Sequence, residues 1–558
     1  MNKTLLRFLL AVGVLSSLLI ACCCVLDEQE FDLPPEQEPT EMVAPEGDAE
    51  PVESDEHVAD MGFRPDNDGF RFENYGSEQG GQDLTAVEVR RMFGDQVCAS
   101  VSGGECLLTP PARQWMEEMN EAMADGHCEG MAVLSLLFYF DQLQERDFGN
   151  STTYGLSLSG NEKLQREIAY WWATQDPVWE YEILGSPNEI LDRLVTALAD
   201  GSDSFTIGIF YPDGSGGHAV TPFAVQDFGG GKWGILVYDN NYPGSIRIID
   251  IDRNANAWSY EAAINPGVES DLYRGDADTQ TLALYPTSKR LGVQPCSFCA
   301  DDEWGRAYGT AVLAQRYNEI WLDGDADLLL TDEQGRRYGY ADGEFVTEIP
   351  GVRAQTWLYQ VDVWNIDQEP VYYVPLGMAF NVTVDAGRLA QDALSEVTMI
   401  GPGYDLVIAD LWLDAGEKDV ITFSPDGREI SYRTDYNDSP DIVLGVETEA
   451  ADYEFIVAAL DIEAGAEFFV RLDMDKGQLS INTRGAQEYG TYEVVMLRIN
   501  DAGEQWFQND DIYLEPNDTA YLRFFEWEGP GDSLFIDIDY GSDGSIDESI
   551  ELVDEYVK

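Results

Sequence analysis

Three residues of this 558-residue chain could together form a nucleophilic catalytic site: Cys128, His218 and Asp239. A thiol becomes a nucleophile when a base takes its proton and a third group orients that base. Cys128 opens a run of strong helix formers, which places it in the first helical turn, with Asp125 and Gly126 as expected cap residues. There the helix dipole and the free N–H groups stabilise a thiolate. Because free cysteines are usually inert core residues, catalysis depends on finding the base.

The choice of base is narrow because the chain has three histidines. His57 lies in an acidic, proline-rich segment and is set aside. His127 adjoins the cysteine, and adjacent side chains of a helix point about 100° apart, so it cannot easily bind the thiol. His218 opens a strand after a glycine-rich turn, at a strand end where a cleft can form. His218 is therefore the predicted base.

Asp239 is the predicted orienting residue because a hairpin brings it to His218. The turn of this hairpin is the triplet Gly229-Gly230-Gly231, and the two residues lie eleven and ten positions from Gly229. Residues at equal distances from a hairpin turn face each other across the two strands. Asp239 is therefore expected almost opposite His218. Asn240 should point to the other face of the strand and is the weaker candidate.

The elements around these residues predict an α+β domain over residues 62–290. The helix that begins at Cys128 and continues through Phe140 is apolar on nearly every face, as expected for a helix buried on all sides. The patterns predict helices over 85–92, 109–124, 163–172 and 190–198, and capping boxes at Thr85–Glu88 and Ser186–Glu189 open the first and the last of them. Strands are predicted over 205–210, 217–225, 233–239 and 245–251. Helices followed by an antiparallel sheet are typical of the α+β class.

The order of these motifs resembles that of the papain-like cysteine peptidases in the broad sense, which include bacterial C39-like peptidases and transglutaminase-like hydrolases. The shared features are a cysteine at the start of a buried helix, a histidine in Gly217-His218-Ala219-Val220, and an aspartate in Tyr238-Asp239-Asn240-Asn241. The resemblance implies Cys128 as nucleophile, His218 as general base and then acid, Asp239 as orienting residue, and an acyl-enzyme intermediate.

The chain departs from papain in two places near the cysteine. No glutamine stands shortly before Cys128, and Glu129 occupies the position of the usual aromatic residue. The side-chain donor of the oxyanion hole is therefore unassigned. The main-chain N–H of Cys128 is one candidate donor, and Gln114 and Asn120 are candidates for the side-chain donor.

Four of the eight cysteines are expected in disulfides. Cys98 and Cys106 flank a loop that contains glycine, and an oxidising compartment favours a local bridge between them. Cys296 and Cys299 form a C-x-x-C pair for which a structural disulfide is the favoured state. A structural zinc site needs four ligands, and the chain has no second C-x-x-C pair to supply the other two. The alternative is therefore a zinc site in which Cys98 and Cys106 join Cys296 and Cys299.

The N-terminus indicates export. Residues 1–21 combine two basic residues with a short apolar run, and Leu19-Ile20-Ala21-Cys22 resembles the lipobox of bacterial lipoproteins. The resemblance implies cleavage before Cys22 and lipidation of its thiol. The acidic, proline-rich residues 22–61 are then a disordered tether. The expected location is the extracellular face of a bacterial cell membrane, with simple secretion as the alternative.

The net charge of −73 limits the kinds of molecule that the chain is expected to bind. A field of this sign repels nucleic acid and anionic lipid surfaces, so no nucleic acid is expected as a partner. Membrane contact is expected only through the lipid anchor.

The C-terminal half is predicted to be all β. After a connector at 291–319, short strands and Asp-Gly turns predict β-sandwich modules at 320–450 and 451–558. Carboxylates crowd one turn of the second module, where Asp539, Asp543 and Asp547 are weak candidates for binding calcium. No other metal or cofactor is expected.

The sequence therefore predicts an extracellular, membrane-anchored cysteine hydrolase that cleaves an amide bond in a peptide or protein. Two alternatives stay open: a transglutaminase-like acyltransferase that uses the same triad, and an inactive binding or adhesion protein of the cell surface. The β modules are expected to bind a surface ligand or to space the catalytic domain, by analogy with other modular proteins.

Overall fold

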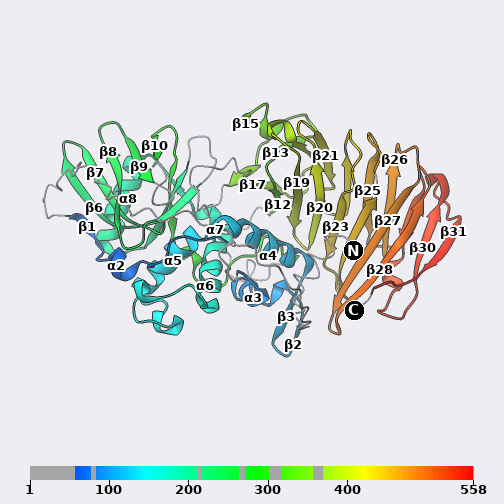
Figure 1. Ribbon diagram of the computed structural model, residues 1–558, viewed down its shortest axis with the longest axis horizontal. Coiled ribbons are helices and arrows are strands. Elements are labelled where there is room, and N and C mark those ends of the chain that lie inside the picture. Colours follow the sequence, from blue (N-terminus) through cyan, green and yellow to red (C-terminus); the bar gives the residue numbers. More distant parts are fainter. Residues whose placement is uncertain are drawn as a thin grey trace, which may run out of the picture. The chain divides into compact units, whose positions relative to one another are not determined.

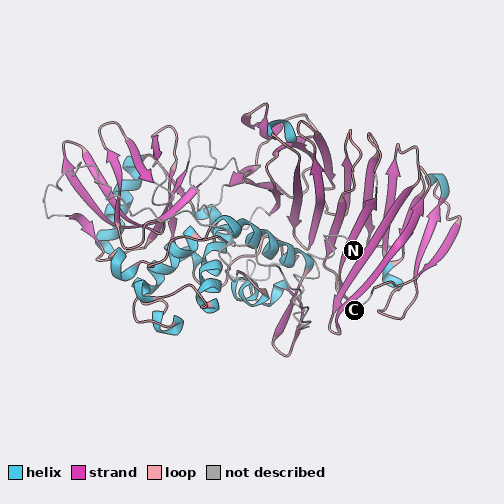
Figure 2. Cartoon of the chain, in the orientation of Figure 1, coloured by secondary structure: helices cyan, strands magenta, loops and turns pink. Residues whose placement is uncertain are grey.

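The computed structural model describes residues 57–76, 83–210, 217–262, 271–300, 316–355, 369–460 and 462–556. The fold is mixed α+β: helices are concentrated in its N-terminal part, and antiparallel strands make up most of the rest (Figures 1 and 2). The expected signal peptide, the lipidation residue Cys22 and most of the expected tether lie outside the described residues. None of the helices within these ranges is long and apolar enough to cross a membrane.

The first region contains the helices and one antiparallel sheet. The helices are α2 (Pro65–Asp68), α3 (Ala86–Phe93), α4 (Pro110–Ala122), α5 (Cys128–Tyr139), α6 (Glu162–Ala173), α7 (Gln175–Val178) and α8 (Pro187–Asp200). The sheet has the order β10-β9-β8-β7-β6-β5-β11-β4, and β1 also pairs with β6. Its strands are β1 (His57–Asp60), β4 (Ile183–Leu184), β5 (Phe205–Phe210), β6 (Gly217–Gly229), β7 (Lys232–Asp239), β8 (Ile246–Asp252), β9 (Ala257–Ala262), β10 (Asp271–Asp276) and β11 (Leu282–Pro286).

Two sequence signals start the predicted helices. Thr85 and Glu88 form the expected capping box at α3, and Ser186 and Glu189 form another at α8. The start of α5 differs from expectation. His127 is its N-cap residue, in place of Asp125 or Gly126, and makes no capping hydrogen bond with its side chain. The His127 ring is instead held by residues far away in the sequence, so tertiary contacts fix this helix end.

Helices cover both faces of the first sheet. Ile190 and Leu194 of α8 pack with Ile207 and Val220 in one apolar cluster. On the other face, Cys128 and Ala132 of α5 pack with side chains of β5, β6 and β11: Phe210, Ala219, Ala283 and Tyr285. Successive residues of a strand point to opposite faces, which is why β6 serves both clusters.

Helix α5 is buried on all sides, as its sequence predicts. Every residue from Cys128 to Phe138 is buried. Gly130 lets α6 approach closely, because a Cβ atom at this position would lie 2.1 Å from the carbonyl oxygen of Ile168. A larger residue there would force the two helices apart. The central helix is therefore tightly fixed within the first region.

The expected tether ends earlier than predicted. His57 to Asp60 form β1, which pairs with β6, so the fold begins before residue 61. Phe63 then packs against Phe223 and Tyr238 of the sheet. His57 therefore belongs to a strand of the first region.

The second region is one continuous pair of sheets. The nine-stranded sheet has the order β16-β17-β12-β19-β20-β23-β24-β27-β28, and the eleven-stranded sheet has the order β15-β14-β13-β18-β21-β22-β25-β26-β29-β30-β31. The strands are β12 (Tyr317–Asp323), β13 (Asp327–Asp332), β14 (Arg337–Ala341), β15 (Glu344–Thr347), β16 (Arg353–Gln355), β17 (Val371–Pro375), β18 (Phe380–Asp385), β19 (Ala393–Gly401), β20 (Tyr404–Leu413), β21 (Lys418–Phe423), β22 (Glu429–Arg433), β23 (Asp441–Val446), β24 (Asp452–Leu460), β25 (Glu467–Asp473), β26 (Gln478–Arg484), β27 (Gly490–Asn500), β28 (Gly503–Leu514), β29 (Thr519–Leu522), β30 (Leu534–Asp539) and β31 (Glu548–Leu552).

The expected boundary between two modules at residue 450 is absent. Strands β23 and β24 pair across it, from Asp441–Ala458 to Val446–Tyr453. One apolar core extends from Ile320 to Ile538 between the two sheets. Hairpins alternate between the sheets along the chain, which places each new hairpin beside the previous one. The sequence predicted an all-β region here, and this alternation joins the two expected modules into one double sheet.

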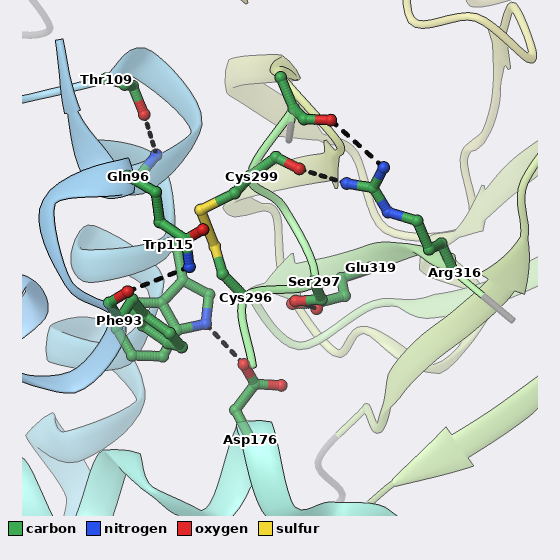
Figure 3. The surroundings of a disulfide bond; sticks show 12 residues. Phe93, Gln96, Thr109, Trp115, Asp176, Cys296, Ser297, Cys299, Arg316 and Glu319 are labelled. Carbon is green, nitrogen blue, oxygen red and sulfur yellow. Dashed lines mark hydrogen bonds between the residues drawn. A yellow bond between two sulfur atoms is a disulfide. The ribbon is translucent and has the colours of Figure 1, made fainter. Parts of the chain in front are cut away.

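The four cysteines considered for disulfides are joined in two local pairs. Cys98 of β2 (Cys98–Ser102) and Cys106 of β3 (Glu105–Leu108) form one bridge with an S–S distance of 2.04 Å. Cys296 and Cys299 form the other, with an S–S distance of 2.07 Å. The second bridge lies beside Trp115 and Phe93 of the helical region (Figure 3). The alternative four-cysteine zinc site is therefore not formed.

Candidate active site

Cys128, His218 and Asp239 come together at the start of α5 and the adjoining ends of β6 and β7. The side chain of His218 hydrogen-bonds through Nε2 to Oδ1 of Asp239 at 2.8 Å. Both side chains are fully buried, and so is Cys128. Cys128 is the one free cysteine in the described part of the chain.

The hairpin pairs these residues with an offset. Val220 lies opposite Asp239, and bulges at Pro222/Ala224 and Asp227/Gly229 shift the register from that of a regular hairpin. His218 is two residues from Val220 and therefore points to the same face of the sheet as Asp239. A diagonal pair of this kind is still within reach of long side chains. The expected meeting of His218 and Asp239 thus occurs, through a diagonal contact.

The environment of His218 favours the imidazolium form. Burial alone would lower the pKa of His218, but the charge of Asp239 and the hydrogen bond to it outweigh burial. The neighbouring Cys128 acts in the same direction, and the pKa rises from 6.5 to about 10. Among the described residues no group occupies Nδ1 of His218 as a regular hydrogen-bond partner. Nδ1 is therefore the ring nitrogen that is left for the neighbouring Cys128 thiol.

Asp239 is held from three directions. Besides His218, the hydroxyl of Tyr260 on β9 donates to its Oδ2 at 2.5 Å, and the main-chain N–H of Asn241 donates to its Oδ1 at 2.8 Å. Burial would raise the pKa of Asp239, but the positive charge of His218 and these hydrogen bonds lower it below its usual value. Tyr260 is a positioning residue that sequence reasoning missed. No local motif marks it, because two further strands separate it from His218.

Asn240 connects the helix to the sheet from the other face. Its side-chain amide donates to the carbonyl oxygen of Cys128 at 2.9 Å and to that of Ala219 at 3.2 Å. Adjacent residues of a strand point to opposite faces, so Asn240 is still expected to point away from Asp239. It fixes the start of α5 relative to β6, and so the sulfur relative to the imidazole.

Glu129 lies in a second buried network beside the thiol. Its carboxylate accepts hydrogen bonds from Arg290 and from the Thr206 hydroxyl, the latter at 2.8 Å. The side chains of Glu129 and Arg290 are both fully buried. Burial raises the pKa of Glu129, whereas Arg290 and the hydrogen bonds oppose this rise. Glu129 therefore anchors the helix start to the segment that follows β11.

His127 has a structural environment, as its position predicts. Its two ring nitrogens hydrogen-bond to the carbonyl oxygen of Tyr75 at 2.7 Å and to Asp83 at 3.0 Å. The ring also stacks on Tyr75, with ring centroids 4.3 Å apart. These contacts leave neither nitrogen for the thiol.

The two side chains considered for the oxyanion hole are engaged elsewhere. The amide of Gln114 donates to Glu118 at 2.9 Å. Asn120 exchanges two hydrogen bonds with the main chain of Leu84. Neither contact is with the triad. The main-chain N–H of Cys128 stays a candidate, because the first N–H groups of a helix lie outside its own hydrogen-bond ladder.

The three aspartates considered for calcium are used by the turns around them. Asp539 accepts the main-chain N–H groups of Asp543 and Gly544, both at 2.9 Å. Asp547 accepts that of Tyr540 at 2.9 Å. Across the described ranges, no three His, Cys, Asp or Glu side chains are grouped as a metal site requires.

Comparison with known proteins gives no relative: no family model, curated protein or solved structure matches this chain.

Proposed function

We propose that the chain is a cysteine hydrolase of the papain-like type that cleaves amide bonds in peptides or proteins. The observation that carries this proposal is the 2.8 Å contact between His218 and Asp239, with the imidazole next to the only free thiol of the described chain. A nucleophile, a base and an orienting carboxylate in this order are the minimal set for acyl transfer through a thioester.

The first half of the reaction forms the acyl-enzyme. With the pKa of His218 near 10, both ring nitrogens carry a proton at neutral pH, so the ring can serve as the acid of this half-reaction. The Cys128 sulfur attacks the carbonyl carbon of the substrate, and the resulting oxyanion is stabilised by main-chain N–H groups such as that of Cys128. His218 donates its Nδ1 proton to the leaving nitrogen, the C–N bond breaks and a thioester forms.

The second half releases the acid. His218, now neutral, takes a proton from a water molecule that attacks the thioester carbon. The C–S bond breaks, the carboxylic acid leaves, and the thiolate and imidazolium are restored. Asp239 stays ionised throughout and holds Nε2 of the ring, which keeps Nδ1 directed at the reacting atoms.

An extracellular location is part of the proposal. The two disulfides support an oxidising compartment. We propose that a lipid on Cys22 anchors the chain to the outer face of a bacterial cell membrane and that a peptide or protein is the substrate there.

Replacement of Cys128 tests the proposal. Cys128→Ala should abolish cleavage of casein-derived peptides by the full chain, as followed by mass spectrometry of the products. Ser135→Ala is the matched control: it also removes a single side-chain heavy atom from the same buried helix, and it should leave cleavage unchanged. Cleavage that persists in Cys128→Ala would exclude this thiol. Incorporation of a primary amine without net hydrolysis would assign the transferase reaction instead.

A catalytically silent surface protein is the second candidate, and the complete burial of all three side chains favours it. Iodoacetamide distinguishes the two. In an active site that opens to substrate, the peptide containing Cys128 should be alkylated at pH 7 faster than glutathione. Alkylation slower than that of glutathione would support the silent protein.

A further inference from the structure

The outer face of the eleven-stranded sheet contains a groove of about 380 Å³ that plays no part in the proposed hydrolase site. We call it the sheet groove. Its lining comes mainly from β25, β26 and β29 and includes Phe469, Arg471, Gln478, Asn482, Arg484 and Tyr521. A volume of this size falls within the range of small-molecule sites, which is roughly 300–1,000 Å³.

Positive charge is concentrated in the sheet groove. Residues 441–558 contain 29 Asp and Glu but only six Lys and Arg, and three of these six line the groove: Arg471, Lys476 and Arg484. Glu429 and Asp473 also line it, so the groove has one excess positive charge within a strongly negative surface. A local field of this kind attracts an anionic ligand of low charge.

Arg484 is the cation that is left for a ligand. Arg471 has Glu429 at 3.7 Å, and Lys476 has Asp473 at 3.0 Å. The side chain of Arg484 makes neither an ion pair nor a hydrogen bond within the described residues, but its guanidinium stacks on the ring of Phe469 at 3.7 Å. The stacking holds the guanidinium in one plane, and a fixed guanidinium binds a carboxylate through two parallel hydrogen bonds.

Asn482 supplies a polar group at the buried end of the groove. Its amide nitrogen donates to the carbonyl oxygen of Asp518 at 2.7 Å and to the hydroxyl of Thr519 at 3.2 Å. Because a carbonyl oxygen only accepts, this contact fixes which way the amide points. The residue is 7% exposed, and its Oδ1 atom has no hydrogen-bond partner among the described residues. A buried acceptor without a partner is costly, and a ligand hydroxyl can supply the missing hydrogen bond.

We infer that the sheet groove binds a short acidic oligosaccharide. The acid group would lie on Arg484, the sugar hydroxyls would bond to Gln478 and Asn482, and the ring of Tyr521 would face an apolar side of the sugar. Glu429 and Asp473 distinguish this ligand from an acidic peptide. Both carboxylates accept hydrogen bonds from hydroxyl groups, whereas they repel a dense run of negative charge.

Titration calorimetry of the full chain with 3′-sialyllactose, a trisaccharide that carries a single carboxylate, tests the inference. Binding should be measurable below about 10 mM and should weaken at least about tenfold in Arg484→Gln, which removes the charge. The matched control is Arg523→Gln. Arg523 also lies over an aromatic ring, that of Phe535 at 4.9 Å, but outside the groove lining, and its loss should leave binding unchanged.

Three outcomes would overturn the inference: no binding of 3′-sialyllactose, equal binding by Arg484→Gln, or equal binding of a neutral trisaccharide or of oligoglutamate. Circular dichroism of each variant excludes a folding defect as the cause of lost binding. The inference is independent of the proposed hydrolase function, because Cys128→Ala should bind 3′-sialyllactose as tightly as the unmodified chain.

Discussion

Asp239 and His218 form a buried charge pair, and this pair determines how the rate of peptide cleavage should depend on pH. The pKa of His218 lies near 10 because of Asp239, so the imidazolium form persists far above neutral pH. We expect kcat/KM for peptide cleavage to fall as pH rises through about 10, where the ring loses the proton that the leaving group needs. A pH–rate profile measures this directly.

Asp239→Asn provides the matched comparison. Loss of the negative charge should move the alkaline decline of kcat/KM toward pH 6.5, the ordinary pKa of histidine, and lower its maximum by about 10²–10⁴-fold. Asp250→Asn on the exposed side of β8 removes a similar charge outside the site and should leave the profile unchanged. If Asp239→Asn keeps an alkaline limb near pH 10, Asp239 is not the group that controls His218.

At the scale of elements, the start of α5 depends on the ion pair between Glu129 and Arg290. A buried charge that loses its partner is costly, so Glu129→Gln should lower the free energy of unfolding by about 3–5 kcal/mol. Glu129→Gln combined with Arg290→Met should recover part of this loss, since no buried charge then lacks a partner. Urea unfolding of the three variants measures both effects. Equal stability of Glu129→Gln and the unmodified chain would show that the pair does not anchor the helix.

The elements also show how far sequence reasoning reaches. Local signals predicted most of the first region: the capping boxes at Thr85 and Ser186, the glycine hairpin, and the all-apolar helix after Cys128. These features depend on a few neighbouring residues, so the sequence contains them directly. His218 and Asp239 could be paired because a single hairpin joins them.

What the sequence did not reveal depends on contacts between distant residues. Tyr260 reaches Asp239 from β9, and Arg290 reaches Glu129 from 161 positions away along the chain. The boundary expected at residue 450 failed for the same reason: strand periodicity identifies each strand but does not say which sheet the strand joins. The sequence does offer one indirect signal. A carboxylate inside an apolar helix, such as Glu129, needs a positive partner, so a cation from elsewhere in the chain is expected beside it.

At the scale of the whole molecule, buried carboxylates link stability to pH. The helical region packs on the nine-stranded sheet through acidic side chains: Asp176 accepts hydrogen bonds from Trp115 at 2.7 Å and from Tyr373 at 2.9 Å. Burial is the main cause that raises the pKa of Asp176 to about 6 and that of Glu118 to about 7. Within the double sheet, burial likewise raises the pKa of Glu369 to about 8 and that of Asp419 to about 7.

These raised values predict a chain that is more stable in mild acid than at alkaline pH. A carboxyl group whose folded pKa exceeds its unfolded value of 3.8–4.5 binds a proton more tightly in the folded state. Between these two pKa values, stability falls as pH rises. The raised pKa of His218 acts in the same direction: its contribution is complete below pH 6.5 and is lost progressively as pH rises from there to about 10. The urea midpoint should therefore be higher at pH 5.5 than at pH 8.5.

Glu369→Gln separates burial from general surface repulsion as the cause of this trend. A neutral amide cannot ionise, so the variant should lose less stability between pH 5.5 and 8.5 than the unmodified chain. Salt separates the effect of surface repulsion from that of the buried carboxylates. At about 1 M salt the repulsion among the surface charges, which arises from the net charge of −73, is screened, whereas buried groups are screened much less. A pH trend that persists in salt and flattens in Glu369→Gln would assign it to buried carboxylates. A trend that disappears in salt would assign it to the surface charge, and a midpoint higher at pH 8.5 would contradict the linkage altogether.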